Sequence, residues 1–316
     1  MSKNKYLYIF NYDYNERELC KLESKYIFKD KEENKFLFSD FTIEPSYSAF
    51  IKKRLEIISF SESYNTLIKN IRTENINIEG FKVEYVVLAD DTTEYKTRLE
   101  KIREIGHCIE GEAKYKNPTL TYGLCYLNSI WYFGELKTNN FDWHEHKKKP
   151  KSFSNSISIS IAKSLVNIAS KANKSTSLLD ACCGVGTILL EACFAGNTIE
   201  GCDINGKTCD NARENLLHFN YSAIVHHSDI KNITDKYDAI IIDLPYNLFT
   251  KVSEDTNFHI IESTSKLTNR LIIVSTSDIT PLINNAGFKV TDYCIVTKKG
   301  KKNFSRKIWV CEKSEY

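Results

Sequence analysis

A short apolar run that leads into a turn of small residues is the most informative segment of this chain. Residues 178–187 read Leu-Leu-Asp-Ala-Cys-Cys-Gly-Val-Gly-Thr, a pattern that predicts a strand, a glycine turn and a helix that opens at Thr187. Three further carboxylates each stand where a later apolar run ends, those of Asp203, Asp229 and Asp243. Ligands of doubly wound sheets bind in the crevice outside the carboxyl ends of the strands, so these carboxylates are predicted to share one site with Asp180.

The glycine turn distinguishes between two classes of cofactor. A dinucleotide site has the pattern Gly-x-Gly-x-x-Gly/Ala, whereas Leu189 holds the third glycine position here. S-adenosyl-L-methionine has no phosphate, and its site needs glycines for close backbone approach and carboxylates for its amine and hydroxyl groups. We therefore predict this cofactor, with Asp180 at the methionine end, Asp203 at the ribose and Asp229 at the adenine amino group. The predicted cofactor-binding residues are Asp180, Cys182, Gly184, Gly186, Thr187, Asp203, Ile204, Asp229 and Ile230.

For each of these carboxylates the alternative is a structural role, as a helix N-cap or a loop residue. The two adjacent cysteines, Cys182 and Cys183, are predicted to pack the loop rather than to act as nucleophiles.

A second motif, Asp243-Leu244-Pro245-Tyr246, is predicted to hold the methyl acceptor. Methylation of an amine on a planar ring needs groups that accept its N–H hydrogen bonds while the nitrogen lone pair faces the methyl carbon. The Asp243 carboxylate and the Leu244 carbonyl are the predicted acceptors. Pro245 is predicted to hold the turn and Tyr246 to stack on the base. The alternative is an ordinary strand end with a turn proline.

The order of the periodic segments predicts the fold class, α/β. From Ser177 onward strands alternate with helices, which predicts a parallel, doubly wound, Rossmann-like sheet with an antiparallel hairpin of the last two strands at its edge. An amphipathic helix is predicted to begin near Ile157. The first half alternates short aromatic strands with charged helices, which predicts an α+β region. The predicted domains are residues 1–60, residues 61–140, a polar linker at 141–156 and a C-terminal domain at 157–316.

Composition limits the classes of protein that remain. The chain has 316 residues with 43 Lys and Arg against 41 Asp and Glu, so it is not basic overall, and any nucleic-acid contact must come from local clusters such as 147–151 and 298–307. The alternative for each cluster is a solvated lysine surface. The ten cysteines lack the paired spacing of a zinc site, so no metal is expected. No signal peptide or long apolar span is visible, and we expect a cytoplasmic protein with no membrane association.

Those motifs resemble the THUMP-containing RNA methyltransferases that make N2-methylguanosine in tRNA. The family's Asp-Pro-Pro-Tyr maps onto Asp243 to Tyr246, where Leu244 departs from the first proline, and its acidic cofactor loop maps onto 180–187. The linker at 149–156 and the segment Trp131-Tyr132-Phe133-Gly134 also match. The resemblance implies a ferredoxin-like region at 1–60, a THUMP-like RNA-binding domain at 61–140 and a Rossmann-like methyltransferase domain at 157–316.

The resemblance implies an S-adenosylmethionine-dependent enzyme that methylates the exocyclic N2 amine of a guanosine in tRNA. The target base must be flipped out of its helix to be reached. One alternative is an amine methyltransferase that acts on DNA adenine or on protein glutamine, and another is an RNA-binding homologue without activity. We expect a monomer, and a small activating protein subunit stays open as a further partner.

Overall fold

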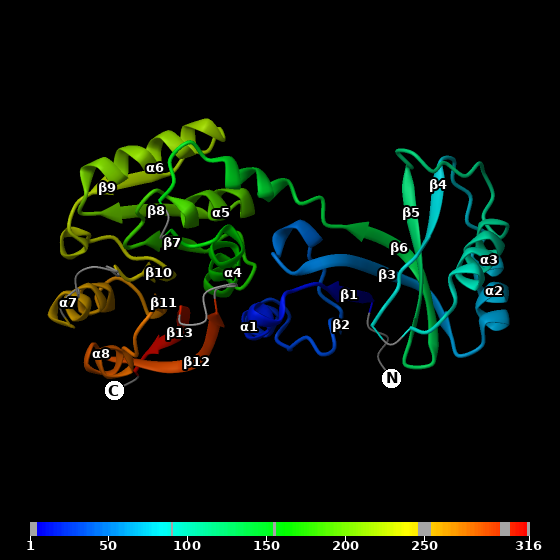
Figure 1. The fold of residues 1–316 in the computed structure, drawn as a ribbon, viewed down its shortest axis with the longest axis horizontal. Coiled ribbons are helices and arrows are strands. Elements are labelled where there is room, and N and C mark those ends of the chain that lie inside the picture. Colours follow the sequence, from blue (N-terminus) through cyan, green and yellow to red (C-terminus); the bar gives the residue numbers. More distant parts are fainter. Residues whose placement is uncertain (1–4, 90, 154–155, 246–253, 298–303, 315–316) are drawn as a thin grey trace. The chain divides into compact units, whose positions relative to one another are not determined.

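The computed structural model describes residues 5–89, 91–153, 156–245, 254–297 and 304–314, and these residues form two compact units (Figure 1). Unit 1 comprises residues 1–11, 32–46 and 51–140, and unit 2 comprises residues 12–31, 47–50 and 141–316. Both units combine helices and strands, which confirms the predicted α/β class. Within the described ranges, no helix has both the length and the apolar character needed to cross a membrane.

Unit 1 is built on one six-stranded sheet with the order β2-β1-β3-β6-β5-β4. Its strands are β1 (Tyr6–Phe10), β2 (Phe36–Ser39), β3 (Ile51–Ser61), β4 (Phe81–Tyr85), β5 (Leu120–Leu127) and β6 (Ile130–Thr138). Only β4 and β5 pair in parallel among the described strands of this sheet. The long β3–β6 pairing joins strands from both predicted N-terminal regions, so one sheet runs through 1–60 and 61–140. The predicted domain limits themselves remain a prediction.

Two helices of unit 1, α2 (Tyr64–Thr73) and α3 (Tyr95–Gly106), pack on its sheet because each has one apolar stripe. Leu67 and Ile71 of α2 and Ile105 of α3 are fully buried against Phe133 of β6. Unit 1 therefore contains helices of the kind that the sequence pattern predicts for the first half.

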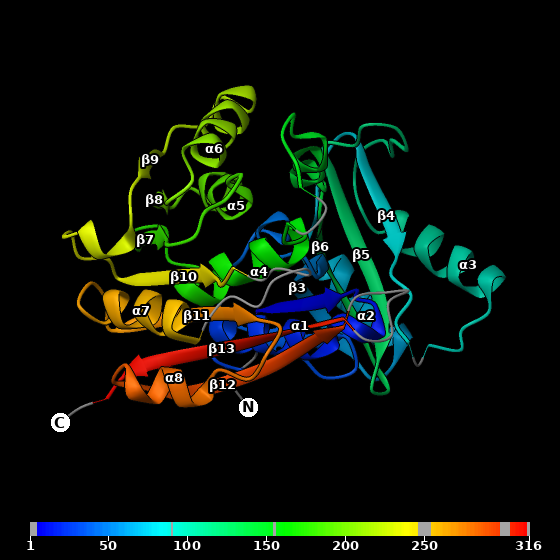
Figure 2. The same ribbon diagram turned by 60° about the vertical axis from the view of Figure 1, so that its left-hand side comes forward.

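Unit 2 holds a seven-stranded sheet with the order β12-β13-β11-β10-β7-β8-β9. Five strands run in parallel: β7 (Ser177–Asp180), β8 (Thr198–Asp203), β9 (Ile224–His227), β10 (Ala239–Asp243) and β11 (Arg270–Ser275). The last two, β12 (Phe288–Thr297) and β13 (Ser305–Lys313), are antiparallel to each other at one edge (Figure 2). The predicted parallel sheet with an edge hairpin is confirmed.

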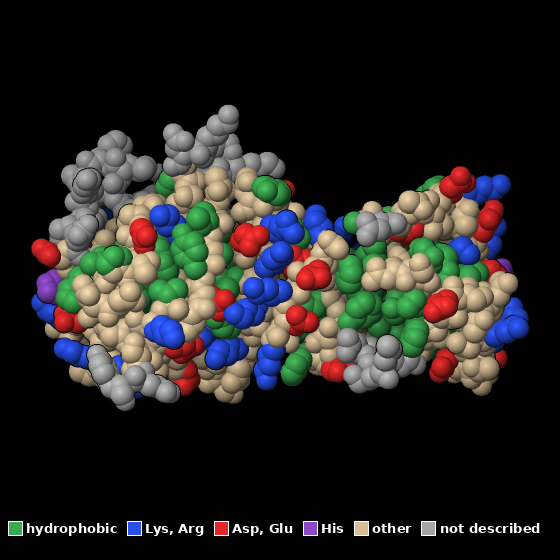
Figure 3. Space-filling view, turned by 90° about the horizontal axis from the view of Figure 1, so that it is seen from below, with side chains coloured by type: hydrophobic (Ala, Val, Ile, Leu, Met, Phe, Trp, Pro, Cys, Tyr) green, Lys and Arg blue, Asp and Glu red, His purple; other side chains and the backbone are tan. Residues whose placement is uncertain are grey.

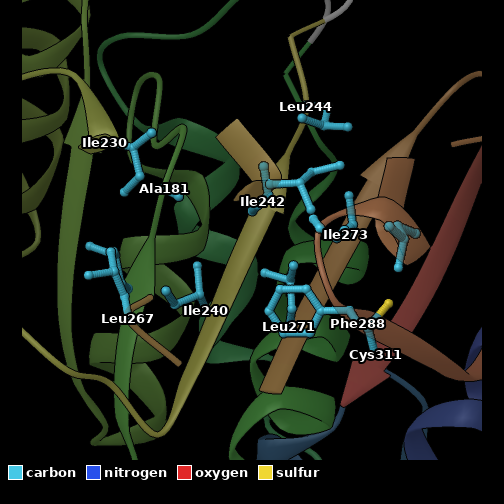
Figure 4. Close-up of a cluster of buried hydrophobic side chains, with 14 of the residues drawn as sticks. Ala181, Ile230, Ile240, Ile242, Leu244, Leu267, Leu271, Ile273, Phe288 and Cys311 are labelled. Atoms are coloured by element: carbon cyan, nitrogen blue, oxygen red, sulfur yellow. The ribbon is translucent and has the colours of Figure 1, made fainter. Parts of the chain in front are cut away.

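Helices cover both faces of the second sheet. On one face α4 (Ile159–Ser170) packs against β7, β10, β11 and α5 (Thr187–Ala195), while α6 (Gly206–His218) lies against β8 and β9. On the other face, α7 (Glu254–Ser265) and α8 (Thr280–Asn285) contribute Ile261 and Ile283 to a buried apolar cluster with β10 and β11 (Figure 4). The sheet is thereby held rigid between two helical layers.

One helix of unit 2 differs from its sequence pattern. The α4 helix does not leave a polar face exposed, because eleven of its twelve residues are buried, including Lys163 and Asn167. The reason is α1 (Arg17–Phe28), which packs on α4 from a distant part of the sequence and belongs to unit 2. Asn167 donates a 2.7 Å hydrogen bond to Glu23 of α1.

A buried polar cluster joins the linker to this layer. Within the predicted linker, residues Asp142–Lys148 form a 3₁₀ helix, η3, and the Nδ1 atom of its His146 lies 2.7 Å from Oε1 of Glu191 on α5. The ammonium of Lys163 lies 3.6 Å from the other Glu191 oxygen, and both side chains are almost fully buried. Burial lowers the pKa of Lys163. Glu191 is thus the shared anionic partner of two buried side chains.

We expect Glu191→Gln to lower the free energy of unfolding of unit 2 by about 2 kcal/mol, because it removes the anion that faces a buried ammonium. Urea denaturation followed by fluorescence and circular dichroism measures this loss. The matched control is Glu145→Gln on η3, an exposed glutamate paired with Lys148, which should change stability by less than about 0.5 kcal/mol. Equal losses in both variants would contradict the role given to Glu191.

Candidate active site

The turn between β7 and α5 is shaped by two glycines with positive φ. Gly184 has φ +50° and Gly186 has φ +80°, a region of backbone conformation that side chains other than glycine rarely adopt. A Cβ added at Gly184 would meet no atom within 4 Å, so the backbone there borders open space. The Cys183 N–H donates to the Cys202 carbonyl (3.0 Å), which fastens the turn to β8. The turn therefore presents bare backbone to the crevice.

Asp203, at the end of β8, organises the loops around this crevice. Its Oδ2 atom accepts a 2.9 Å hydrogen bond from the Gly184 N–H, and its Oδ1 atom accepts one from the Asn205 N–H. Its carbonyl accepts from the Ser228 N–H (3.0 Å) at the next loop. Each carboxylate oxygen can accept a second bond, so Asp203 can hold the loops and still bind a hydroxyl group.

Two further carboxylates lie at neighbouring strand ends, that of Asp180 buried and that of Asp243 half-buried. Asp180 is 1% exposed, and burial raises the pKa of its carboxyl well above the ordinary value, with further increases from the charges of Asp243 and Asp203. Burial raises the pKa of Asp243 to about 7, while the charge of Arg306 acts to lower it. Within the described part of the chain, the Oδ1 atoms of Asp180 and Asp243 have no hydrogen-bond partner. Such buried acceptors fit a site that binds a cationic or N–H-bearing ligand.

Two adjoining cavities bring most of the predicted site residues together. The first, of about 380 Å³, is lined by residues of the glycine turn with the Asp180 and Asp243 side chains. The second, of about 600 Å³, is lined by Ile204, Asp229 and Ile230. Three residues line both cavities: Cys182, Asp203 and Pro245. The arrangement is an elongated space with carboxylates along its length and apolar walls at one end.

Each predicted site residue has a definite place in relation to these cavities, apart from Tyr246, which lies outside the described residues. Gly186 lines neither cavity; it caps α5 and packs against Ala212 of α6. Asp229 lines the second cavity and also caps η4 (Ile230–Asn232), where its side chain accepts a hydrogen bond from the Lys231 N–H. This residue therefore has the predicted place at the site and also the alternative role of an N-cap. The remaining predicted residues line at least one cavity: Asp180, Cys182, Gly184, Thr187, Asp203, Ile204, Ile230, Asp243, Leu244 and Pro245.

The two cysteines of the turn fit their predicted packing role. Burial raises the pKa of both the Cys182 and the Cys183 thiol, and neighbouring carboxylates raise them further. A thiol that stays protonated is a poor nucleophile. Among the described residues, no group of His, Cys, Asp or Glu side chains could hold a metal ion.

Leu244 replaces a proline of the resembling family without loosening the strand end. Its N–H donates a 3.0 Å hydrogen bond to the Val274 carbonyl, which extends the pairing of β10 with β11 by one residue. A proline has no N–H and could not make this bond. The Leu244 side chain is 1% exposed and joins Ile242 and Ile273 in the apolar cluster (Figure 4). The leucine thus fixes the position of its own carbonyl by a different means.

Sequence reasoning missed several cavity-lining residues. Phe153 of the linker and Ile157, just after the linker, line the first cavity. His259 and Ile260 of α7 line the second. None of them lies at the end of a parallel strand, which was the signal used. Asn205 could have been found, because an Asn that precedes a glycine at a helix start is a typical N-cap, and its side chain accepts from the Lys207 N–H.

Close packing under the turn makes Gly201 of β8 sensitive to substitution. A Cβ at this position would lie 2.9 Å from Leu189 Cδ1 and 3.0 Å from the Cys183 sulfur. We expect Gly201→Ala to lower the free energy of unfolding by about 1–3 kcal/mol and to displace the turn, since the strand is paired on both sides. Urea denaturation measures the first effect and cofactor titration the second.

The control for this prediction is Gly106→Ala at the end of α3, where an added Cβ meets no atom within 4 Å. It should leave stability unchanged or raise it by about 0.5 kcal/mol. If Gly201→Ala behaved in the same way, the packing under the turn would not be tight.

Comparison with known proteins finds similarity in the part of the chain that holds the site. Residues 147–257 match the family model described as RMKL-like, methyltransferase domain. The chain is 32% identical over 116 residues to a tRNA (guanine(10)-N2)-dimethyltransferase of Methanothermobacter thermautotrophicus. These residues are 36% of this chain and 34% of that protein. The chain thus matches about a third of the length of this curated relative.

Two solved structures show a likeness at low identity. The structure of TrmN from Thermus thermophilus aligns over 98% of this chain and 99% of its own length, with 15% identity and a TM-score of 0.49. Magnesium protoporphyrin IX methyltransferase from Synechocystis, solved with bound S-adenosylmethionine, has 16% identity and a TM-score of 0.43 over 55% of this chain and 93% of that one. Likenesses this distant say nothing about the activity of this chain. Residues 147–257, which match the RMKL-like methyltransferase family model, hold nearly all of the candidate site.

Proposed function

We propose that the chain is an S-adenosylmethionine-dependent methyltransferase that modifies the exocyclic N2 amine of a guanosine in tRNA. The observation that carries this proposal is the half-buried Asp243 carboxylate, whose buried Oδ1 atom is an open acceptor in the cavity beside the glycine turn, within the segment that matches a methyltransferase family model. The curated relative that matches this domain is named for guanine-N2 methylation of tRNA.

The residues present fit the cofactor. We assign the first cavity to its methionine part, where the Asp180 carboxylate faces the amine, and the second cavity to its adenine, between Ile204 and Ile230. Asp203 lines both cavities and is assigned to the ribose hydroxyls, and Asp229 to the adenine amino group. The unpartnered Asp180 oxygen matches a cationic ammonium, and S-adenosylmethionine supplies an electrophilic methyl group when bound.

Asp243 and Leu244 are assigned to the acceptor amine. The carboxylate and the Leu244 carbonyl accept its two N–H hydrogen bonds, which leaves the nitrogen lone pair directed at the methyl carbon. As the new N–C bond forms, the C–S bond breaks and its electron pair stays on sulfur. The nitrogen then has one proton too many, and the Asp243 carboxylate takes it. A pKa of about 7 suits a group that must accept and then release a proton near neutral pH.

The proposed substrate is a planar base of tRNA. A base stacked in a helix is out of reach, so the enzyme must flip it out, and Tyr246 is proposed to stack on it. Acidic side chains lie among the Lys and Arg side chains on the face shown in Figure 3, so contacts with tRNA phosphates are proposed to come from local clusters such as 147–151. We propose a cytoplasmic, monomeric enzyme, with a small activating subunit as a further partner.

The test is transfer of a labelled methyl group to unmodified tRNA, to DNA and to protein in parallel. The proposal expects label in tRNA alone, recovered as N2-methylguanosine after digestion to nucleosides. Label in DNA adenine or in protein glutamine would favour an amine methyltransferase of another substrate class. Binding of tRNA without cofactor binding by calorimetry would indicate an inactive homologue.

A further inference from the structure

We propose that Arg306 is a positioning residue for methyl transfer: its guanidinium shares one face of the sheet with Asp243 and favours the ionised form of that carboxylate. This inference rests on the proposed function for the role of Asp243. Arg306 belongs to a basic segment that the sequence offered for phosphate contacts, yet it is only 6% exposed. A side chain that is so buried is poorly placed to act as a surface phosphate ligand.

Strand alternation fixes the face on which Asp243 lies. Ile240, Ile242 and Leu244 project into the apolar cluster under α7 and α8 (Figure 4). Side chains alternate along a strand, so Ile241 and Asp243 project to the opposite face, toward α4.

Strand alternation also places Arg306 on that opposite face. Trp309 and Cys311 of β13 belong to the cluster under α7 and α8, so Ile308 and Arg306 project to the other side. The registers agree with this placement, because Asp243 is level with Val274 of β11 and Val274 is level with Ile308. Since β13 is antiparallel, Arg306 lies two residues beyond that level, toward the carboxyl ends of the parallel strands where the crevice is.

The charges around Asp243 explain why a cation is needed there. Asp180 on β7 and Asp203 on β8 are the acidic neighbours in the crevice, and the Cys182 thiol lies with them. Burial raises the pKa of Asp243, and Arg306 acts in the opposite direction. A protonated carboxyl group cannot take up the proton of the substrate amine, because it already carries one. Loss of the Arg306 charge should therefore disable Asp243 near neutral pH.

The experiment compares Arg306→Met with Arg306→Lys and with Lys307→Met, the next residue on the same strand, which projects to the other face. Two readouts are measured for each protein: the pH profile of kcat for tRNA methylation, and the titration of the Asp243 carboxyl carbon by ¹³C NMR, assigned with Asp243→Asn. We expect the rising limb of kcat near pH 7 to move up by about one pH unit in Arg306→Met, together with the carboxyl titration. Arg306→Lys and Lys307→Met should keep both within about half a unit, whatever happens to KM.

The outcomes separate this inference from its alternatives. If Arg306→Met raises only the KM for tRNA and leaves the limb in place, Arg306 is a substrate contact and the inference is wrong. A uniform loss of kcat at all pH values, with the carboxyl titration unmoved, also overturns it and indicates a structural role. Should wild type methylate no tRNA at any pH, the proposed function fails, while the carboxyl titration still decides whether Arg306 controls Asp243.

Discussion

Asp243→Ala is expected to lower kcat for methyl transfer about a thousandfold while the affinity for the cofactor changes less than about threefold. The carboxylate is the acceptor for the substrate N–H and for the proton released when the nitrogen is methylated, and its Oδ1 atom has no other partner among the described residues. The cofactor itself is assigned to the glycine turn and to Asp180, so its binding should persist. Single-turnover kinetics with tRNA and calorimetry with adenosylhomocysteine measure the two effects.

Two further variants sharpen this prediction. Asp243→Asn keeps one acceptor oxygen but cannot take a proton, so its rate should fall between those of wild type and Asp243→Ala. Asp238→Ala, just before the other end of β10, removes an exposed carboxylate that accepts from the Ser177 N–H (2.7 Å), and it should keep kcat. If Asp243→Ala retained more than a tenth of the wild-type rate, Asp243 would not be the acceptor group.

The second large effect is expected from Asp180→Asn, which should weaken cofactor binding about a hundredfold. This side chain is the buried anion at the end of the cavity assigned to the methionine ammonium, and an amide of the same shape cannot balance that charge. Calorimetric titration with S-adenosylmethionine measures the loss. Asp235→Asn, in the loop before β10, supplies a control in which the same change is made outside the cavities.

Asp180→Asn should also change how the stability of the protein depends on pH. The folded-state pKa of Asp180 is raised above its unfolded value of about 3.9, so the cost of ionising it grows as pH rises above that value and stability falls. In the cofactor-free protein, Asp180→Asn removes this cost, and it should be more stable than wild type in urea at pH 8 and not at pH 4. If wild type gained stability relative to Asp180→Asn between pH 4 and pH 8, the pKa assigned to Asp180 would be wrong. If the variant bound the cofactor as tightly as wild type does, the place assigned to Asp180 at the methionine ammonium would be wrong.

Much of the second half of the chain could be predicted because its signals are local. The apolar run at 178–181, the positive-φ glycines and the carboxylates at successive strand ends all follow from short-range rules, and parallel order then brings them together. The C-terminal hairpin was predicted for the same reason. The burial of α4 on nearly all sides could not be predicted, because α1 covers it from more than a hundred residues away and no local pattern encodes that contact.

At the site, too, the sequence failed to predict features that depend on contacts between distant parts of the chain. Phe153 was assigned to a linker and Ile157 to the start of a helix, and their place beside the glycine turn depends on how this segment folds back. The basic segment at 298–307 could be interpreted only by charge, whereas strand parity in the folded sheet separates Arg306 from Lys307. For Leu244, the sequence shows the loss of a proline but not the hydrogen bond to Val274 that replaces its rigidity.

The most direct test of the central claim is a crystal structure of the protein with adenosylhomocysteine. The proposed arrangement predicts that the ligand spans both cavities, with its amine at Asp180, its ribose at Asp203 and its sulfur facing the Asp243 end of the crevice. A ligand bound away from Gly184 and Asp203, or with its sulfur directed away from Asp243, would contradict the proposal that this crevice brings a methyl donor to a nucleobase amine.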